Sequence, residues 1–202
     1  MTPEEAESFD RCVAAGGLAL FPSDTVYGLA TDPESEAGVS RLYALKGRPP
    51  ARPAALMFFD LDLALATLGE VGRRTGAALA RLLPGPFTLV LPNPARRYAL
   101  ACGPHPDRLG VRVPALSGAL EPLGAVRHPV LQSSANRSGE PEARRLEDVH
   151  PQLRRGVDLE LDGGELPGAP STVIDLAAYE EDGDYRVLRE GAVSAAEIAA
   201  LL

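Results

Sequence analysis

Lys46 is the only lysine in a chain of 202 residues, and it stands in a short basic cluster with Arg48 and Arg52. Lysine presents a compact point charge and arginine a planar fork, and phosphate oxygens accept hydrogen bonds from both. The cluster therefore points to a phosphate-bearing ligand. A single lysine that survives by chance in an arginine-rich chain explains Lys46 alone equally well.

Four segments share a pattern in which a short apolar strand runs straight into hydroxyl or basic side chains. They are residues 21–25, 111–114, 131–136 and 170–173. In open α/β sheets, ligands bind outside the carboxyl ends of the strands, so these polar residues are expected to meet in one cleft that suits an anionic substrate. For each segment alone, ordinary turn and capping chemistry is the simpler explanation.

Familiar catalytic and cofactor motifs are missing from the sequence. It has no P-loop, no dinucleotide-binding glycine pattern, no nucleophile-elbow serine and no zinc-binding spacing of Cys or His. The formal net charge of -8 argues against a broad nucleic-acid surface but leaves room for a small basic pocket. The acidic N-terminus lacks a signal sequence and no apolar run approaches the length of a membrane span, so we expect a cytoplasmic protein.

The elements that must position these residues follow from hydrophobic spacing and capping signals. The spacing predicts helices over residues 3–15, 35–45, 60–68, 75–83, 117–123 and 194–202, and the second helix delivers Lys46 at its C-terminal end. Strands are predicted over residues 17–21, 54–59, 87–91, 109–113, 130–132, 157–161, 172–176 and 185–188, with an acidic turn at 180–184. This mixture predicts a single three-layer α/β domain over residues 1–202.

Seven motifs occur together in the order typical of one family. They are Pro22–Leu29, Lys46–Pro49, Pro84–Thr88, Val111–Pro114, Ser134–Gly139, Ser171–Asp175 and Leu188–Gly191. On these residues the chain resembles the YrdC/TsaC family of threonylcarbamoyl-AMP synthases, in its short single-domain form. The resemblance implies a YrdC-like α/β fold, a twisted open mixed sheet with flanking helices around a concave cleft.

The resemblance also implies an activity. The family condenses L-threonine, bicarbonate and ATP into threonylcarbamoyl-AMP and pyrophosphate, for the threonylcarbamoyladenosine modification of tRNA. It implies a downstream threonylcarbamoyl-transferase as partner. Mg²⁺ is expected to be held by the ATP phosphates and water, since the sequence shows no cluster of carboxylates, and no stable nucleic-acid complex and no membrane are expected. Two other functions stay open, namely an RNA-binding factor of the same fold and a carbamoyl-adenylate module that acts on another acceptor.

The family's functional residues carry over position by position. Catalytic roles are implied for Lys46, Arg48, Ser134 and Asn136, and ATP binding for the same four together with Arg52, Glu142 and Arg189. Threonine binding is implied for Thr25, Met57, Arg112, Gln132, Ser171 and Thr172. Arg112 is expected to grip the carboxylate, because a guanidinium holds a carboxylate through two hydrogen bonds. Met57 stands near a position where some members carry a histidine, and its thioether cannot donate a hydrogen bond.

Two further expectations concern exposure and movement. Lys46 is expected to be an exposed phosphate contact, so that its removal hardly disturbs the core. Residues 140–145 and 162–170 are the two candidate lids over the nucleotide, because of their length and their Gly and Pro content, and the sequence does not decide between them.

Overall fold

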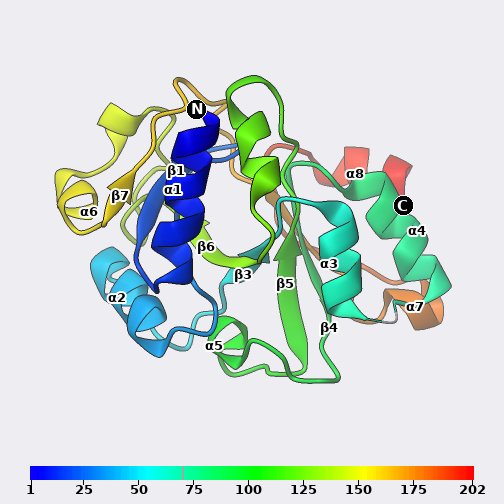
Figure 1. The fold of residues 1–202 in the computed structure, drawn as a ribbon. Helices are drawn as coiled ribbons and strands as arrows, with labels where there is room; N and C mark the ends of the chain where they lie inside the picture. Colours follow the sequence, from blue (N-terminus) through cyan, green and yellow to red (C-terminus); the bar gives the residue numbers. More distant parts are fainter. Residues whose placement is uncertain (70) are drawn as a thin grey trace.

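The structure is a computed structural model that describes residues 1–69 and 71–202. Within these residues the chain forms one nine-stranded mixed sheet in the order β7-β1-β2-β6-β3-β5-β4-β8-β9 (Figure 1). The strands are β1 (Ala19–Pro22), β2 (Tyr27–Thr31), β3 (Ala55–Met57), β4 (Phe87–Pro92), β5 (Arg108–Arg112), β6 (Val130–Ser134), β7 (Leu159–Glu160), β8 (Thr172–Asp175) and β9 (Arg186–Arg189). The fold class expected from the sequence, a mixed α/β sheet with flanking helices, is confirmed.

Helices flank this sheet, and most of them are short. The α-helices are α1 (Pro3–Ala14), α2 (Glu36–Lys46), α3 (Leu61–Leu68), α4 (Arg73–Leu82), α5 (Ala99–Cys102), α6 (Pro151–Arg155), α7 (Tyr179–Asp182) and α8 (Ala195–Leu201). Two 3₁₀ helices, η1 (Gly118–Ala125) and η2 (Leu146–Asp148), complete the set among the described residues. No helix in residues 1–69 or 71–202 has both the length and the apolar character needed to cross a bilayer.

Three helices begin at the capping residues that the sequence predicted. Thr2 and Glu5 form the expected capping box at the start of α1, and Ser194 and Glu197 form another at the start of α8. The side chain of Asp60 accepts a hydrogen bond from the backbone N–H of Leu63 at 2.8 Å and so begins α3. These caps are confirmed because each depends only on residues three apart in sequence.

The sequence-based assignment missed several elements. Strand β2 was not expected, because Gly28 and Ala30 interrupt the run of large apolar residues that marks a strand. It forms because it pairs with β1 on one side and with β6 on the other. The short helices α5, α6 and α7 were also missed, and the helix predicted over 117–123 is the 3₁₀ helix η1, which contains Pro122.

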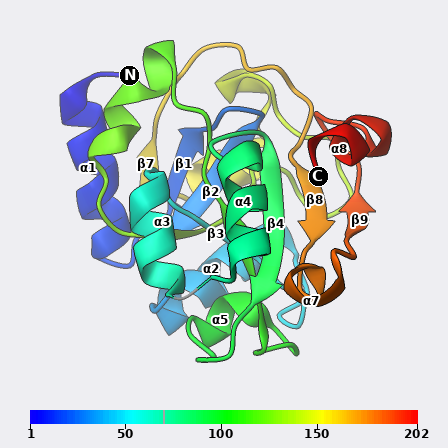
Figure 2. The same ribbon diagram turned by 90° about the vertical axis from the view of Figure 1, so that its right-hand side faces the viewer.

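One face of the sheet carries the larger hydrophobic core. Leu20, Leu29, Leu56 and Val111 point into it from four strands, since alternate residues of a strand share a face. Helices α2, α3, α4 and α8 cover this face with their own apolar side chains. Figure 2 shows α3 and α4 side by side in front of the strands, with the C-terminal helix α8 next to α4.

The opposite face is only partly covered. At one end it packs a smaller core, in which Phe21, Met57 and Val130 meet Phe9 of α1 and Leu123 of η1. Helices α1 and η1 lie side by side over this end (Figure 1). The rest of the face carries small or polar side chains at the alternate positions, and there the sheet floors an open cleft.

Candidate active site

The cleft has a volume of about 800 Å³ and lies across the face of the sheet. Its floor consists of residues from strand interiors as well as strand ends, including Gly28, Ala55, Val90, Gly110 and Gln132. The sequence predicted a ligand site outside the carboxyl ends of the strands, but the cleft lies across the face of the sheet, so this prediction is wrong. Most neighbouring strands run antiparallel here, so their carboxyl ends do not gather at one edge.

Lys46 stands at the C-terminal end of α2 and is almost completely buried, with 3% of its surface exposed. It continues the buried stripe of Val39, Leu42 and Tyr43 at helical spacing, which carries its aliphatic stem inward. Gly47, in the left-handed conformation with a φ of 60°, ends the helix directly after it. The expectation of an exposed lysine is wrong, because the helix buries the stem while the ammonium reaches the cleft.

The Lys46 ammonium holds the loop that follows β6. It donates to the backbone carbonyl of Ser134 and, at 2.6 Å, to that of Asn136. The hydroxyl of Ser134 in turn donates to the side-chain carbonyl of Asn136, and the backbone N–H of Ser138 donates to the carbonyl of Lys46 at 3.1 Å. The two motifs that contain Lys46 and Ser134 thus form one bonded unit in the cleft wall.

Arg48 and Arg52 line the cleft together with Lys46 and Arg189, and these four cations are called the cationic wall. Arg48 donates to the carbonyl of Pro53 and lies over the ring of Tyr43, with its guanidinium carbon 5.5 Å from the ring centroid. Burial, together with the charge of Arg52, lowers the pKa of Arg48. Lys46 experiences the same environment, and burial and the charges of Arg48 and Arg52 lower its pKa to about 8. A set of cations that depress one another's pKa values is primed to attract an anion.

Arg112, on β5, is the centre of a second group. One terminal nitrogen of its guanidinium donates to the carboxylate of Asp24, to the hydroxyl of Thr25 at 2.6 Å and to that of Ser23 at 3.4 Å. The side chains of Arg112 and Asp24 are only 4% and 7% exposed. The Nε of Arg112 is buried and has no hydrogen-bond partner among the described residues, so one donor of the fork remains free.

Hydroxyl groups lie on the neighbouring strands. The side chains of Thr88 and Ser171 are hydrogen-bonded to each other at 2.8 Å, and both line the cleft. Arg189 donates to the backbone carbonyl of Ser171 at 2.6 Å, and burial is the main cause of its lowered pKa. Short hydroxyls beside a guanidinium can bind a small polar zwitterion.

Most of the site residues expected from the sequence meet in this cleft. It is lined by Lys46, Arg48, Arg52, Arg112, Gln132, Ser134, Asn136, Glu142, Ser171 and Arg189. Three of the expected residues do not line it. Thr25 is buried behind Arg112 and reaches the cleft only through that side chain.

The side chains of Met57 and Thr172 are fully buried and do not reach the cleft. Met57 is fully buried in the smaller core under α1 and η1. Thr172 is fully buried on the opposite face of the sheet from Ser171, and its hydroxyl donates to the carbonyl of Val193 at 2.6 Å. The expectation that either contacts threonine is not met by this geometry, because neither side chain reaches the cleft.

Several cleft residues were missed by sequence reasoning. They are Thr88, His105, Arg108, Asp175 and Arg186. Arg108 pairs with the buried carboxylate of Asp175 at 2.7 Å, and Arg186 approaches the same carboxylate at 3.5 Å. Arg108 could have been predicted from the strand itself, because alternate residues of β5 share a face and this places Arg108 on the same face as Arg112.

One of the two expected lids is a fixed wall. The hydroxyl of Tyr27 donates to Asp162 and to the carbonyl of Gly164, both at 2.9 Å. Further along, the backbone N–H of Gly168 donates to the carbonyl of Thr25 at 2.9 Å. Residues 162–170 are thereby bonded to the turn between β1 and β2, so a lid role is not supported for them.

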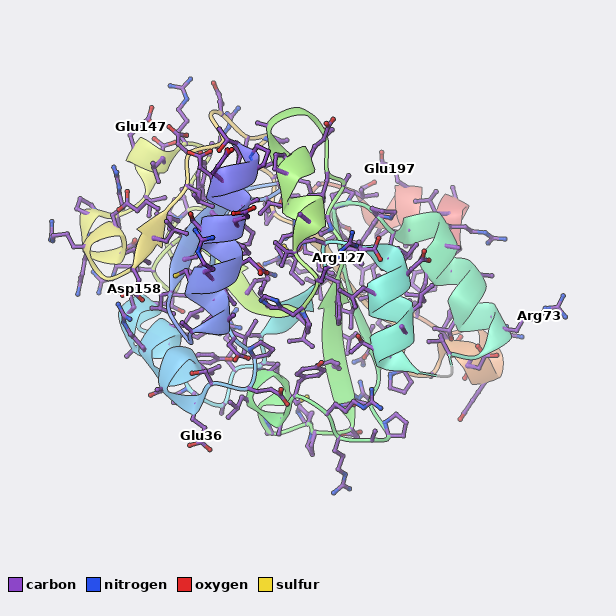
Figure 3. All side chains as sticks on the ribbon, viewed as in Figure 1. Glu36, Arg73, Arg127, Glu147, Asp158 and Glu197 are labelled. Atoms are coloured by element: carbon purple, nitrogen blue, oxygen red, sulfur yellow. The ribbon has the colours of Figure 1, made fainter. Side chains whose placement is uncertain are left out.

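The acidic charge of the chain lies largely outside the cleft. Figure 3 shows Glu36, Glu147 and Glu197 projecting outward from the periphery, and all three are exposed. Among the residues that the structure describes, the cleft is lined by one lysine and six arginines but by three carboxylates. An anion is therefore drawn to this concave surface although the chain as a whole is negative.

Comparisons with known proteins identify the family of the chain. A family model for Sua5/YciO/YrdC proteins, described as "Telomere recombination", matches residues 11–191. A Chromohalobacter salexigens protein named threonylcarbamoyl-AMP synthase is 37% identical over 182 residues, which cover 88% of this chain and 97% of that protein. A Pyrococcus abyssi protein of the same name is 32% identical over 168 residues, 83% of this chain, and this match covers only 49% of its length.

Solved structures of Sua5 and YciO proteins are similar to this chain in fold. The crystal structure of P. abyssi Sua5 complexed with L-threonine superposes with a TM-score of 0.86 at 29% identity, covering 100% of this chain and 58% of that one. The crystal structure of Escherichia coli YciO superposes with a TM-score of 0.80 at 26% identity, covering 96% of this chain and 92% of that one.

Proposed function

Because the chain belongs to the Sua5/YciO/YrdC family, we propose that it is a threonylcarbamoyl-AMP synthase, which joins L-threonine, bicarbonate and ATP. The observation that carries the proposal is that one cleft is lined both by the cationic wall around Lys46 and by the Arg112 group. The cationic wall suits a triphosphate, and the Arg112 group suits the carboxylate of an amino acid. The product is a mixed anhydride, which water hydrolyses, so a downstream threonylcarbamoyl-transferase must receive it for tRNA modification.

The nucleotide phosphates bind to the cationic wall. Lys46, Arg48, Arg52 and Arg189 neutralise the phosphate charge, and the bonded loop from Ser134 to Asn136 supplies polar groups beside them. Arg48 is held by Pro53 and Tyr43 before any ligand arrives. A wall arranged in advance loses little conformational entropy when the phosphates bind.

Threonine binds at the Arg112 group. Its carboxylate accepts from the part of the Arg112 guanidinium that lines the cleft, and Ser23, Thr88, Gln132 and Ser171 offer polar partners to its hydroxyl and amine. Asp24 holds the guanidinium from behind. Met57 and Thr172 are left out of this site because both are fully buried away from the cleft.

The chemistry follows in two steps. The free amine of threonine attacks the carbon of bicarbonate, and loss of water leaves an N-carboxylate. An oxygen of that carboxylate attacks the α-phosphorus of ATP in line, the bond to the bridging oxygen breaks, and pyrophosphate leaves. The protein contributes positioning and charge neutralisation, which dominate phosphoryl-type transfer.

Mg²⁺ is the expected cofactor for the ATP phosphates. In the described part of the chain, no three His, Cys, Asp or Glu side chains come together as a metal site. The ion therefore takes most of its ligands from phosphate oxygens and water, as Mg²⁺ usually does with nucleotides. When bound, it neutralises charge on the leaving pyrophosphate.

The first test is pyrophosphate release from MgATP with threonine and bicarbonate each supplied or withheld. We expect release only when both are present, together with a product of the mass of threonylcarbamoyl-AMP. Release that needs neither co-substrate, or no release while ATP demonstrably binds, contradicts the proposal. In that case the RNA-binding function and transfer to another acceptor become the candidates.

ATP affinity should fall as the pH rises through 8. Burial and two neighbouring arginines lower the pKa of Lys46 from 10.5 to about 8, so its ammonium is fully present below that pH and is lost above it. Each pH unit above 8 should weaken ATP binding by up to about tenfold. The free energy of unfolding should instead rise as the pH increases from 8 to 10.5. In this range the unfolded chain binds more protons at Lys46 than the folded chain does.

The measurement is the ATP dissociation constant between pH 6.5 and 9.5 by calorimetry, for the wild type and for Lys46→Met. The variant should bind weakly and without this pH dependence. An equally steep decline in Lys46→Met would show that another group titrates.

A further inference from the structure

Glu142 is a carboxylate on the wall of a cationic cleft. It is partly buried, and its position is fixed by its neighbours in sequence. The carbonyl of Ala143 accepts from the N–H of Tyr27 at 3.0 Å, and the carbonyl of Arg144 accepts from the N–H of Leu166 at 2.9 Å. The side chain is therefore presented to the cleft by a bonded backbone.

This carboxylate has no partner in residues 1–69 and 71–202, neither a hydrogen bond nor an ion pair within 4 Å. Its charge nevertheless acts on both Lys46 and Arg189, where it opposes the lowering of their pKa values. Those two cations are already engaged with carbonyls, Lys46 with Ser134 and Asn136, and Arg189 with Ser171. Glu142 thus lies near the cationic wall while its oxygens remain available.

A free carboxylate beside a triphosphate is unfavourable unless a cation lies between them. A carboxylate and a phosphate oxygen a few ångströms apart repel each other, and this repulsion is screened less in a partly buried site than in bulk water. A divalent cation turns this repulsion into attraction, and Mg²⁺ in nucleotide sites is typically held by one or two carboxylates together with phosphate oxygens. Glu142 lines the cleft beside the cationic wall, so its carboxylate can supply one such ligand.

We propose that Glu142 is the protein ligand of the Mg²⁺ that enters with ATP. This inference rests on the proposed function, since it places ATP phosphates on the cationic wall. The other cleft carboxylates suit the role less well. Asp175 already pairs with Arg108 and Arg186, and Glu140 is exposed at the rim.

A simpler role for Glu142 is to balance the charge of the empty cleft. The two roles differ in how Glu142 and Mg²⁺ depend on each other. If the carboxylate only balances charge, its removal strengthens ATP binding by the same factor with and without Mg²⁺. If it binds the ion, its removal strengthens binding of free ATP but reduces the gain that Mg²⁺ provides.

The experiment is a double cycle of ATP binding by calorimetry, without threonine so that no turnover occurs. ATP is titrated in excess EDTA and in excess Mg²⁺ into the wild type, Glu142→Gln and Glu36→Gln. Glu36 is a matched control because it is exposed, does not line the cleft and projects outward at the periphery (Figure 3). Mg²⁺ should strengthen ATP binding at least about tenfold in the wild type and the control, and less than about threefold in Glu142→Gln.

A second readout uses Mn²⁺ in place of Mg²⁺. Water-proton relaxation of the Mn²⁺–ATP complex with the protein should change between the wild type and Glu142→Gln, because one ligand of the ion is lost. An equal Mg²⁺ effect in Glu142→Gln and the wild type overturns the inference while ATP binding stands. Failure of the wild type to bind ATP at all instead overturns the proposed function.

Discussion

Lys46→Ala should abolish threonylcarbamoyl-AMP synthesis and also weaken the fold. The ammonium supplies charge to the cationic wall and, at the same time, donates to the carbonyls of Ser134 and Asn136. Loss of one such electrostatic group in an active site typically lowers kcat by at least about 100-fold. Removal of this donor leaves two carbonyls without their partner, which should also lower the free energy of unfolding by about 1–3 kcal/mol.

This result differs from that expected of an exposed phosphate contact, which would leave stability unchanged. The measurements are pyrophosphate release and urea unfolding of the same variant. Lys46→Met is the matched control, because it keeps the buried stem and removes only the donors, so it should recover part of the stability and none of the activity. An active Lys46→Met protein would contradict the assignment of this ammonium to the nucleotide phosphates.

Arg112→Met should remove threonine binding and cause a large loss of stability. Its guanidinium is the only cation that pairs with Asp24 in the described residues, and both side chains are nearly buried. Breaking a buried ion pair from one side leaves an uncompensated charge, which typically costs about 3–5 kcal/mol. Threonine affinity should fall at least about 100-fold, because a carboxylate loses its charged partner.

A double variant separates the two effects. Asp24→Asn removes the unpaired charge and keeps an oxygen that can accept from the N–H of Ala115, as Asp24 does at 3.0 Å. Arg112→Met/Asp24→Asn should therefore regain much of the stability, measured by urea unfolding, while threonine binding by calorimetry stays absent. Recovery of threonine binding in the double variant would show that Arg112 acts only through the fold.

Much of the fold follows from local signals. The caps of α1, α3 and α8 depend on residues three apart, and the apolar stripe of α2 depends on residues three and four apart. Such patterns can be read directly along the chain. Strand β2 could not be read in this way, because Gly28 and Ala30 make a weak pattern and the strand is stabilised by its two partners.

The sequence by itself determined the family, the α/β class and most residues of the cleft, because motif order and local periodicity are properties of the chain. Only the tertiary structure decided which of these side chains are buried, paired or free. Asp24 and Arg112 are 88 positions apart, and their pairing depends on how β5 is placed relative to the turn before β2. The burial of Lys46 and the lack of a partner for Glu142 within residues 1–69 and 71–202 likewise arise from long-range packing, since residue type alone does not specify the environment of a polar side chain.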